Sequence, residues 1–312
     1  MGSEQRDTRP FLGLSSVSAC DADVIVFPLP FEGTVSYGHG TAAGPAAVLR
    51  ASQEIEVWDD EIDFSLDSLK YHTSATFTPA EGDTTGTYLV RLFGKSKMLA
   101  ENDGLLVSIG GEHSITPPLV RGICESKKIA FSDLTVVQFD AHADLRSEYE
   151  GMKQSHACAM RPLVENGSRV IGVGIRSVER DEMQYAEESR RVQTFGAQRL
   201  ADDPEREREL CSTLGNLRGN VYLTIDVDVL EVHLCPGTGT PQPGGLSWWQ
   251  MLRYLRALLH QNPHCNLVGV DIVETVPMLG TQVNEFVSAR VLSKVLAYTF
   301  NGKSKETSES ST

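Results

Sequence analysis

The sequence predicts an α/β fold in which helices cover both faces of a mostly parallel sheet. Short runs rich in Val, Ile and Leu alternate from end to end with segments of helical spacing. No Pro/Gly-rich linker interrupts this alternation, and no solenoid-type repeat appears among the 312 residues. Because α/β enzymes of this length often fold as one unit, we expect a single domain.

The elements follow one another in a regular order. The apolar runs predict six buried strands, at 22–27, 105–109, 134–139, 170–175, 221–225 and 267–270. The helical spacing predicts seven helices, at 44–52, 88–101, 117–125, 180–190, 204–217, 247–260 and 284–298. The domain is expected to span 1–300, with 1–20 as an N-terminal extension. The polar stretch 301–312 is expected to be a disordered tail.

Charge and cysteine usage narrow the class of protein. The chain carries 28 Lys and Arg against 42 Asp and Glu, so its formal net charge is −14. This charge disfavours nucleic acid and anionic membranes as partners and attracts small cations. The sequence shows no secretory leader and no apolar stretch of bilayer-spanning length, and its six cysteines form no CxxC pair. We therefore expect a soluble, cytoplasmic protein with reduced thiols.

Four of the predicted strands run directly into residues that can ligate a metal. The strand at 105–109 is followed by GGEHS and the strand at 134–139 by DAHAD. The strands at 221–225 and 267–270 are followed by DVD and DIVE. Because functional groups gather at the carboxyl ends of parallel strands, these side chains are expected to share one rim of the sheet.

The rim residues predict a site for divalent cations. Six of them have the chemistry of metal ligands, with His and Asp only: His113, Asp140, His142, Asp144, Asp226 and Asp228. Carboxylates this close repel one another unless a cation lies between them. Imidazole and carboxylate ligands suit manganese, and a pair of such ions can activate water for hydrolysis. For DAHAD or DVD alone, a polar turn or a helix cap stays open as the alternative; their recurrence at successive strand ends favours the metal site.

These motifs resemble those of the ureohydrolase family of arginases and agmatinases. The resemblance spans nearly the whole chain, through LPFEGTVSYGHGTAAGPAAVLRAS, IGGEHSIT, VVQFDAHADLR, SHACAMR, VGIRS, LTIDVDVLEVHLCPGTGTPQPGGLS and VGVDIVETVP. It implies a three-layer α/β/α sandwich and assembly into homo-oligomers, trimers or hexamers.

The resemblance also implies roles for the rim residues. One Mn²⁺ would be held by His113, Asp140, Asp144 and Asp226, and a second by Asp140, His142, Asp226 and Asp228. A hydroxide between the two metals would attack a guanidinium carbon, and Asp144 would help to orient it. Glu274 would hold the guanidinium through paired hydrogen bonds. His156 in SHACAMR would pass protons to the leaving amine. The structural alternatives are a surface helix cap for Glu274 and a solvated loop histidine for His156.

The substrate implied by the resemblance is agmatine, which would yield putrescine and urea. In arginases, hydrogen-bonding side chains at two positions bind the α-carboxylate and α-amine of the substrate. This sequence has Arg146 and Met152 at those positions, which disfavours arginine as the substrate. The segment ETVPMLGTQVNEF departs from the agmatinase pattern, so a guanidinobutyrate or other guanidino-acid hydrolase is the alternative, with arginase less favoured. A catalytically silent metal-binding homologue is a further alternative, although no ligand is missing. Five other histidines are interpreted as solvated or structural: His39, His72, His233, His260 and His264.

Overall fold

The computed structural model describes residues 9–309. Its centre is an eight-stranded sheet in the order β4-β1-β5-β10-β9-β6-β7-β8, and every neighbouring pair of strands is parallel. The strands are β1 (Val24–Leu29), β4 (Tyr71–Thr73), β5 (Leu105–Gly110), β6 (Leu134–Phe139), β7 (Arg169–Ile175), β8 (Val192–Gly196), β9 (Gly219–Asp226) and β10 (Cys265–Val273). The predicted parallel sheet is confirmed.

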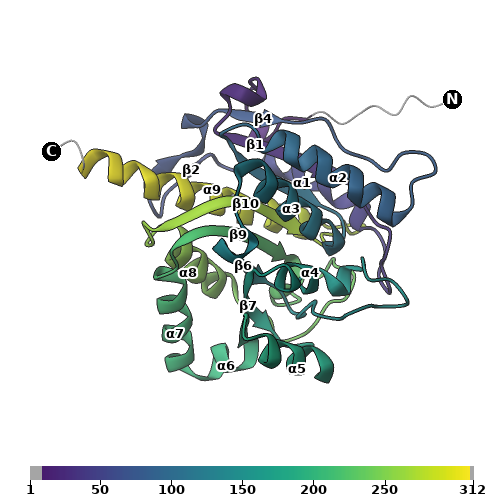
Figure 1. Cartoon of the computed structure of the whole chain (residues 1–312). Helices are drawn as coiled ribbons and strands as arrows, with labels where there is room; N and C mark the ends of the chain where they lie inside the picture. Colours follow the sequence, from purple (N-terminus) through teal and green to yellow (C-terminus); the bar gives the residue numbers. More distant parts are fainter. Residues whose placement is uncertain (1–8, 310–312) are drawn as a thin grey trace.

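Helices pack on both faces of this sheet and complete a three-layer α/β/α sandwich (Figure 1). The helices are α1 (Gly44–Ser52), α2 (Thr85–Leu99), α3 (Thr116–Lys127), α4 (Arg161–Glu165), α5 (Arg180–Ser189), α6 (Ala197–Asp202), α7 (Pro204–Gly215), α8 (Trp248–Leu259) and α9 (Val283–Glu309). Buried side chains of α1 and α6–α9 form a core against one face, and those of α2–α5 form a core against the other. All the predicted strands and helices are present, and their bounds agree within a few residues except at the end of α9, which extends to Glu309 instead of 298.

The sheet divides its side chains between the two cores by alternation. Val24 and Val26 of β1 belong to the core under α1 and α9, whereas Ile25 and Phe27 belong to the core under α2 and α3. Every residue of β1, β5 and β6 is buried. A central strand covered on both faces therefore has a predominantly apolar sequence, which is why these strands could be predicted.

A small hairpin is attached to α9 by buried charges. Strands β2 (Trp58–Asp59) and β3 (Phe64–Ser65) pair antiparallel. Nζ of the buried Lys294 in α9 lies 2.8 Å from Oδ2 of Asp59 and 3.0 Å from Oε2 of Glu61. The Tyr298 hydroxyl donates to the same Glu61 oxygen at 2.5 Å, and Arg256 of α8 also pairs with Glu61. Paired with two carboxylates, the ammonium of Lys294 can be buried without an isolated charge.

The structure also differs from the expected elements. The edge strands β4 and β8, the short helices α4 and α6 and the hairpin were not expected, because none of them has an apolar run or a full helical period. The backbone of α9 continues to Glu309, across most of the expected tail at 301–312. Residues 1–8 of the expected N-terminal extension and 310–312 of the tail lie outside the described residues. All six cysteines are free thiols. Between residues 9 and 309, no helix combines the length and apolar character needed to cross a bilayer.

Candidate metal centre

The rim residues come together because the strands that carry them are neighbours. Strands β5, β10, β9 and β6 are consecutive in the middle of the sheet. His113 begins the 3-10 turn that follows β5, and Asp140 follows β6 directly. Asp226 ends β9, and Glu274 follows the last residue of β10. All four parallel strands end on the same side, so their side chains converge on one point.

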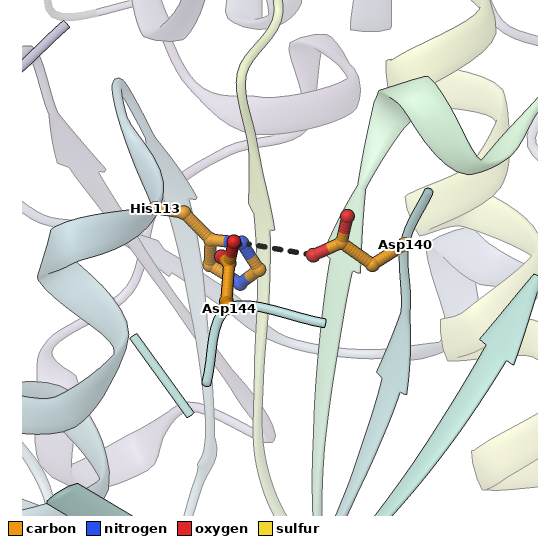
Figure 2. Close-up of side chains that lie close together, drawn as sticks. All are labelled: His113, Asp140 and Asp144. Carbon is orange, nitrogen blue, oxygen red and sulfur yellow. Dashed lines mark ion pairs between the residues drawn. The ribbon is translucent and has the colours of Figure 1, made fainter. Parts of the chain in front are cut away.

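The first ligand cluster surrounds His113. Nδ1 of His113 lies 3.0 Å from Oδ2 of Asp144 and 3.2 Å from Oδ2 of Asp140. Oδ2 of Asp226 lies 3.6 Å from the same nitrogen. Figure 2 shows the imidazole of His113 with the carboxylates of Asp140 and Asp144 turned toward it. Ligand atoms of these three residues lie within 4.8 Å of one another, a spacing that can hold a metal ion.

A second cluster shares Asp140 with the first. Nδ1 of His142 lies 2.9 Å from Oδ2 of Asp228 and 3.7 Å from Oδ1 of Asp140. These three residues again offer ligand atoms within 4.8 Å of one another. Because Asp140 belongs to both clusters, one carboxylate stands between two candidate cation positions. The structure thus brings all six candidate ligands together, with Asp226 beside the first cluster.

Backbone groups fix the carboxylates in this arrangement. Oδ1 of Asp140 accepts a hydrogen bond from the backbone nitrogen of His142 at 2.6 Å, and Oδ2 accepts from Nε2 of Gln138 at 2.8 Å. Oδ1 of Asp228 accepts from the backbone nitrogen of Ala141 at 3.0 Å. Each bond leaves the carboxylate with further lone pairs that can face a cation. The DAHAD loop therefore orients its own aspartate and that of the neighbouring DVD turn.

The hydrogen bonds of His113 test whether a cation fits. Thr224 Oγ1 donates to Oδ1 of the buried Asp271 at 2.5 Å, so at 2.8 Å it can only accept a hydrogen bond from Nε2 of His113. In the neutral ring, Nδ1 then carries the lone pair. This nitrogen is buried and forms no hydrogen bond of acceptable geometry, although carboxylate oxygens surround it. A lone pair facing carboxylates is stable only with a cation between them, so the residues fit a metal ion.

The charges of the protein alone lead to the same conclusion. Burial, followed by the charges of Asp228 and Asp140, raises the pKa of Asp226 well above its usual range. Burial would lower the pKa of His142, but hydrogen bonds to Asp140 and Asp228 raise it to about 11. The carboxylates of Asp140 and Asp144 likewise outweigh burial and raise the pKa of His113. Without a metal ion, the histidines and Asp226 therefore retain protons, because the clustered carboxylates require positive charge close to them. A bound dication would supply that charge in place of the protons.

Glu274 and His156 line the same cleft as the candidate ligands. The cleft has a volume of about 200 Å³, and its walls include His113, His142 and Asp226. Glu274 has a φ of 65°, an uncommon conformation for a residue other than glycine. Its backbone nitrogen donates to the oxygen of Gly111 at 2.7 Å. Burial, followed by the charge of Glu112, raises the pKa of Glu274 to about 8. The strained backbone thus directs a buried carboxylate toward the ligand clusters.

The outer wall of the cleft carries further charged groups. Nη2 of Arg146 lies 3.2 Å from Oε1 of Glu179, and its guanidinium lies 4.8 Å from the centre of the Tyr149 ring. Glu182 also lines the cleft and accepts a hydrogen bond from the backbone nitrogen of Leu145 at 2.8 Å. Arg146 is thus held by a carboxylate and an aromatic ring. Among the described residues, the lining at this end includes the acids Glu179 and Glu182, and Arg146 is the one Lys or Arg that lines the cleft.

The other histidines lie away from this cleft. None of His39, His72, His233, His260 and His264 is among its lining residues. His233 is exposed and lies 3.1 Å from Oε2 of Glu231. His39 is exposed and lies 2.9 Å from Oε1 of Glu32. Their partners in the structure fit the interpretation as solvated or structural residues. Met152 lies in a turn where its backbone pairs with that of Tyr149.

Two residues that orient the site differ from the expectation. Thr224 lies inside β9 and was not found from the sequence. Asp271 of DIVE was expected at the rim, but it is buried inside β10, because this strand continues to Val273. Asp271 accepts the hydrogen bond of Thr224, which in turn contacts His113. Arg176 donates to the backbone oxygen of Asp228 at 2.6 Å and to that of Gln242 at 2.6 Å, which ties the DVD turn to a distant loop. A polar residue at an inward position of a buried strand was the available signal for Thr224 and Asp271. The partners of Arg176 gave no signal in the sequence.

Known proteins resemble this chain over most of its length. A family model described as "Arginase family" matches residues 22–298. The N(1)-aminopropylagmatine ureohydrolase of Synechocystis sp. is 34% identical over 288 residues, which is 90% of this chain and 90% of that protein. The agmatinase of Pyrococcus horikoshii is 32% identical over 84% of this chain and 86% of its own.

Solved structures agree with these relatives. A putative agmatinase from Clostridium difficile superposes with a TM-score of 0.78 at 27% identity and covers 90% of this chain and 98% of its own. The agmatine ureohydrolase of Thermoplasma volcanium has a TM-score of 0.82 at 23% identity, with 95% and 96% covered, and so supports the fold. From the family match across the sheet and its rim, together with relatives above 30% identity, the chain belongs to the arginase family.

Proposed function

We propose that this protein is a ureohydrolase that uses two Mn²⁺ ions to hydrolyse the guanidino group of agmatine to putrescine and urea. The observation that carries the proposal is the shared cleft, which places two His and Asp clusters beside the carboxylate of Glu274. Relatives named agmatinase and N(1)-aminopropylagmatine ureohydrolase support the same reaction class. Imidazole and carboxylate ligands suit manganese among the divalent ions.

The candidate ligands divide into two sets. His113, Asp140, Asp144 and Asp226 would hold one ion, and Asp140, His142, Asp226 and Asp228 would hold the other. Bound there, the two ions would supply Lewis acidity and lower the pKa of water, so that a nucleophile forms near neutral pH. The protein would do the rest by binding the guanidinium, orienting water and moving a proton.

Glu274 is suited to hold the planar guanidinium. Its Oε1 accepts from the backbone nitrogen of His113 at 2.8 Å, which fixes the carboxylate. On the Oε2 side stands Gly239, where even a methyl group would lie 3.6 Å from that oxygen. The absence of a side chain leaves room beside Oε2. The paired N–H groups of a guanidinium match a carboxylate, so Glu274 would place the guanidinium carbon over the ligand clusters.

Asp144 and His156 are proposed to act on protons. The Asp144 carboxylate lies at the first cluster with a φ of 53° in its backbone, and it would orient the attacking water. His156 lines the same cleft and would donate a proton to the leaving amine. Loss of the protonated amine and of urea would then complete the hydrolysis.

The charges of the outer cleft favour a cationic tail. Arg146 is already paired with Glu179 and is therefore not a free cation for a substrate carboxylate. Since Glu179 balances Arg146, Glu182 is the acid that leaves a surplus negative charge at the same end. An amine tail such as that of agmatine would be attracted there, whereas the carboxylate of arginine or 4-guanidinobutyrate would be repelled. N1-aminopropylagmatine, with a longer cationic tail, is the second candidate, favoured by these acids and by the 34% identical relative.

A substrate panel tests the proposal. Urea release is measured with Mn²⁺ present, from agmatine, N1-aminopropylagmatine, arginine, 4-guanidinobutyrate and free guanidine. We expect the highest kcat/KM with agmatine or its aminopropyl derivative. Preference for 4-guanidinobutyrate would show a guanidino-acid hydrolase, and Arg146→Gln should then abolish that preference. No turnover of any compound by protein that binds two ions would show a silent homologue.

Assembly and location belong to the same proposal. The resemblance to ureohydrolases supports a homo-oligomer, a trimer or a hexamer, which light scattering of the purified protein would test. Six free thiols and a net charge of −14 support a reducing, cytoplasmic location without nucleic-acid or membrane partners. Fractionation of cells that express the tagged protein would test the location.

A further inference from the structure

The loop histidine is tied to a buried carboxylate through one threonine hydroxyl. Glu112 is fully buried and follows β5, one residue before the candidate ligand His113. Its Oε2 accepts from the backbone nitrogens of Gly33 and Thr34, both at 2.7 Å. Its Oε1 accepts from the Ser114 hydroxyl at 2.5 Å and from the Thr34 hydroxyl at 2.7 Å. Both oxygens are thus occupied by donors, and the only proton of the Thr34 hydroxyl is directed at Glu112.

The two lone pairs of the Thr34 hydroxyl oxygen face His156. A threonine hydroxyl has one proton and two lone pairs. One lone pair accepts from the backbone nitrogen of His156 at 3.0 Å. The other lies 3.3 Å from Nδ1 of the His156 ring. Because the proton is committed to Glu112, this second contact is a hydrogen bond only if Nδ1 of His156 carries a proton.

We propose that Glu112 and Thr34 are positioning residues that hold His156 in its Nδ1–H tautomer, so that proton exchange takes place at Nε2. Within residues 9–309 no protein group bonds Nε2, and the ring lines the cleft. A neutral His156 thus offers its Nε2 lone pair, and the protonated ring offers an Nε2–H donor. Both forms keep the Nδ1–H bond to Thr34, so the ring can gain and lose a proton without turning.

A second hydroxyl near the ring provides a control. Oγ of Ser155 lies 3.4 Å from Nδ1 of His156. Among the described residues no carboxylate accepts a hydrogen bond from this hydroxyl, so it can donate to Nδ1 or accept from it, and it favours neither tautomer. The His156 ring also makes an edge contact with the Tyr149 ring, with ring centres 5.8 Å apart. This contact does not favour either tautomer. Only Thr34 discriminates between the two nitrogens.

The tautomer can be measured without reference to catalysis. The protein, labelled with ¹⁵N in its histidines and loaded with diamagnetic Zn²⁺ in place of Mn²⁺, is titrated by NMR to the alkaline limit of His156. The His156→Gln variant assigns the resonances. We expect the Nδ1–H form in the native protein, in Thr34→Ser and in Ser155→Ala. Thr34→Val keeps the shape of the side chain but removes the acceptor, and we expect Nε2–H to become the major form.

Kinetics then connect the tautomer to the reaction, and this part rests on the proposed function. General-acid groups contribute roughly 10²–10⁴-fold to rate, so we expect kcat to fall about 10–100-fold in Thr34→Val with KM within about threefold. Thr34→Ser should restore most of kcat, and Glu112→Gln combined with Thr34→Val should be little worse than Thr34→Val alone, because both act through one bond. The melting temperature of each variant separates this effect from unfolding.

The two proposals fail in different ways. An Nε2–H tautomer in the native protein, or an unchanged tautomer in folded Thr34→Val, overturns the positioning role whatever the enzyme does. Absence of urea from every guanidino compound overturns the proposed function but leaves the tautomer measurement intact. An unchanged kcat in Thr34→Val whose tautomer has switched would show that His156 is not the proton donor.

Discussion

Glu274 is joined to His113 by a hydrogen bond of 2.8 Å between its Oε1 and the backbone nitrogen of the histidine. The candidate substrate-binding carboxylate is thereby fixed to the backbone of a candidate metal ligand. A shift of either one moves the other. The distance between a bound guanidinium and the ligand clusters is therefore set within the strands β5 and β10, not by a mobile loop.

This bond leads to a prediction for Glu274→Gln. The glutamine can still accept from His113 through its amide oxygen, but it loses the charge that would pair with a guanidinium. We expect kcat/KM for agmatine to fall by about 10²–10³-fold, in line with loss of one buried charged partner, while metal content stays at two ions per chain. Urea release and elemental analysis check this result. Glu231→Gln, outside the cleft, serves as the control, and full activity in Glu274→Gln would remove Glu274 from the site.

Metal removal should reveal the repulsion among the ligands. Without cations, the like charges around Asp226 oppose folding, because burial and its neighbours raise its pKa. We expect Asp226→Asn to raise the melting temperature of the chelated protein by a few degrees, and to lower that of the Mn²⁺-loaded protein. Calorimetry of the native protein and of Asp226→Asn, each with and without chelator, measures both shifts in melting temperature. If Asp226→Asn lowers the melting temperature equally in both states, the carboxylate has a packing role instead.

Thr224 should tune metal affinity from behind His113. Thr224→Val removes the acceptor of His113 Nε2, so the ring loses the partner that leaves its lone pair on Nδ1. We expect the affinity for the ion that His113 would hold to fall by about 10–100-fold, as for other groups that orient metal-bound histidines. Titration with Mn²⁺ followed by electron paramagnetic resonance measures this constant.

Thr116 offers a matched control for that experiment. Its hydroxyl donates to Asp271 at 2.9 Å, as Thr224 does at 2.5 Å, but it forms no bond to His113. Thr116→Val should therefore leave metal affinity within about threefold of the native value. Equal losses in both variants would assign the effect to Asp271 and not to the orientation of His113.

Stability should depend on pH through Glu61. Burial opposes ionisation, but the bonds from Tyr298 and Lys294 outweigh it and lower the pKa of Glu61 below its unfolded value of 4.5. A carboxyl with a lowered folded pKa stabilises the fold above the unfolded pKa, and this stability is lost as pH falls through the folded pKa. We expect Glu61→Gln to cost about 1–2 kcal/mol at neutral pH, and less with acidification below the unfolded pKa.

Chemical denaturation at several pH values measures this difference. Glu205→Gln is the control, because Glu205 is largely exposed although it pairs with Arg208. Its effect on the free energy of unfolding should be near zero at every pH. A constant penalty for Glu61→Gln down to acidic pH would show that its charge is not what attaches the hairpin to α9.

The predicted parts of the fold share one physical cause. Strands such as β6 are buried on both faces and so are mostly apolar, and a motif such as DAHAD follows such a strand directly. By contrast, β8 is an edge strand with half-buried residues, and β4 has only three residues. At the edge, backbone pairing defines the strand and no apolar run is required, so the sequence carries little signal.

The site shows the same division. His113 and Asp140 could be placed because each stands at the end of a recognisable strand. The contact between Thr34 and Glu112 spans 78 positions and lies in a loop without regular structure. The pairing of the Thr34 hydroxyl with the Glu112 carboxylate depends on how the two loops that carry them are placed relative to each other. The whole fold determines that placement. The positions of these candidate ligands at the strand ends could thus be predicted, and the contacts of the residues that orient the site could not.

The order of the strands has a consequence for how the protein is made. β10 comes last along the chain but lies between β5 and β9. A nascent chain still lacking β10 therefore has no bridge between the turn with His113 and the turn with Asp226. The cluster around His113 can therefore be completed only after nearly the whole polypeptide has been made, whereas the cluster of Asp140, His142 and Asp228 lies on β6 and β9, which pair without β10. Products that end before β10 should lack the cation position beside His113 and be readily degraded.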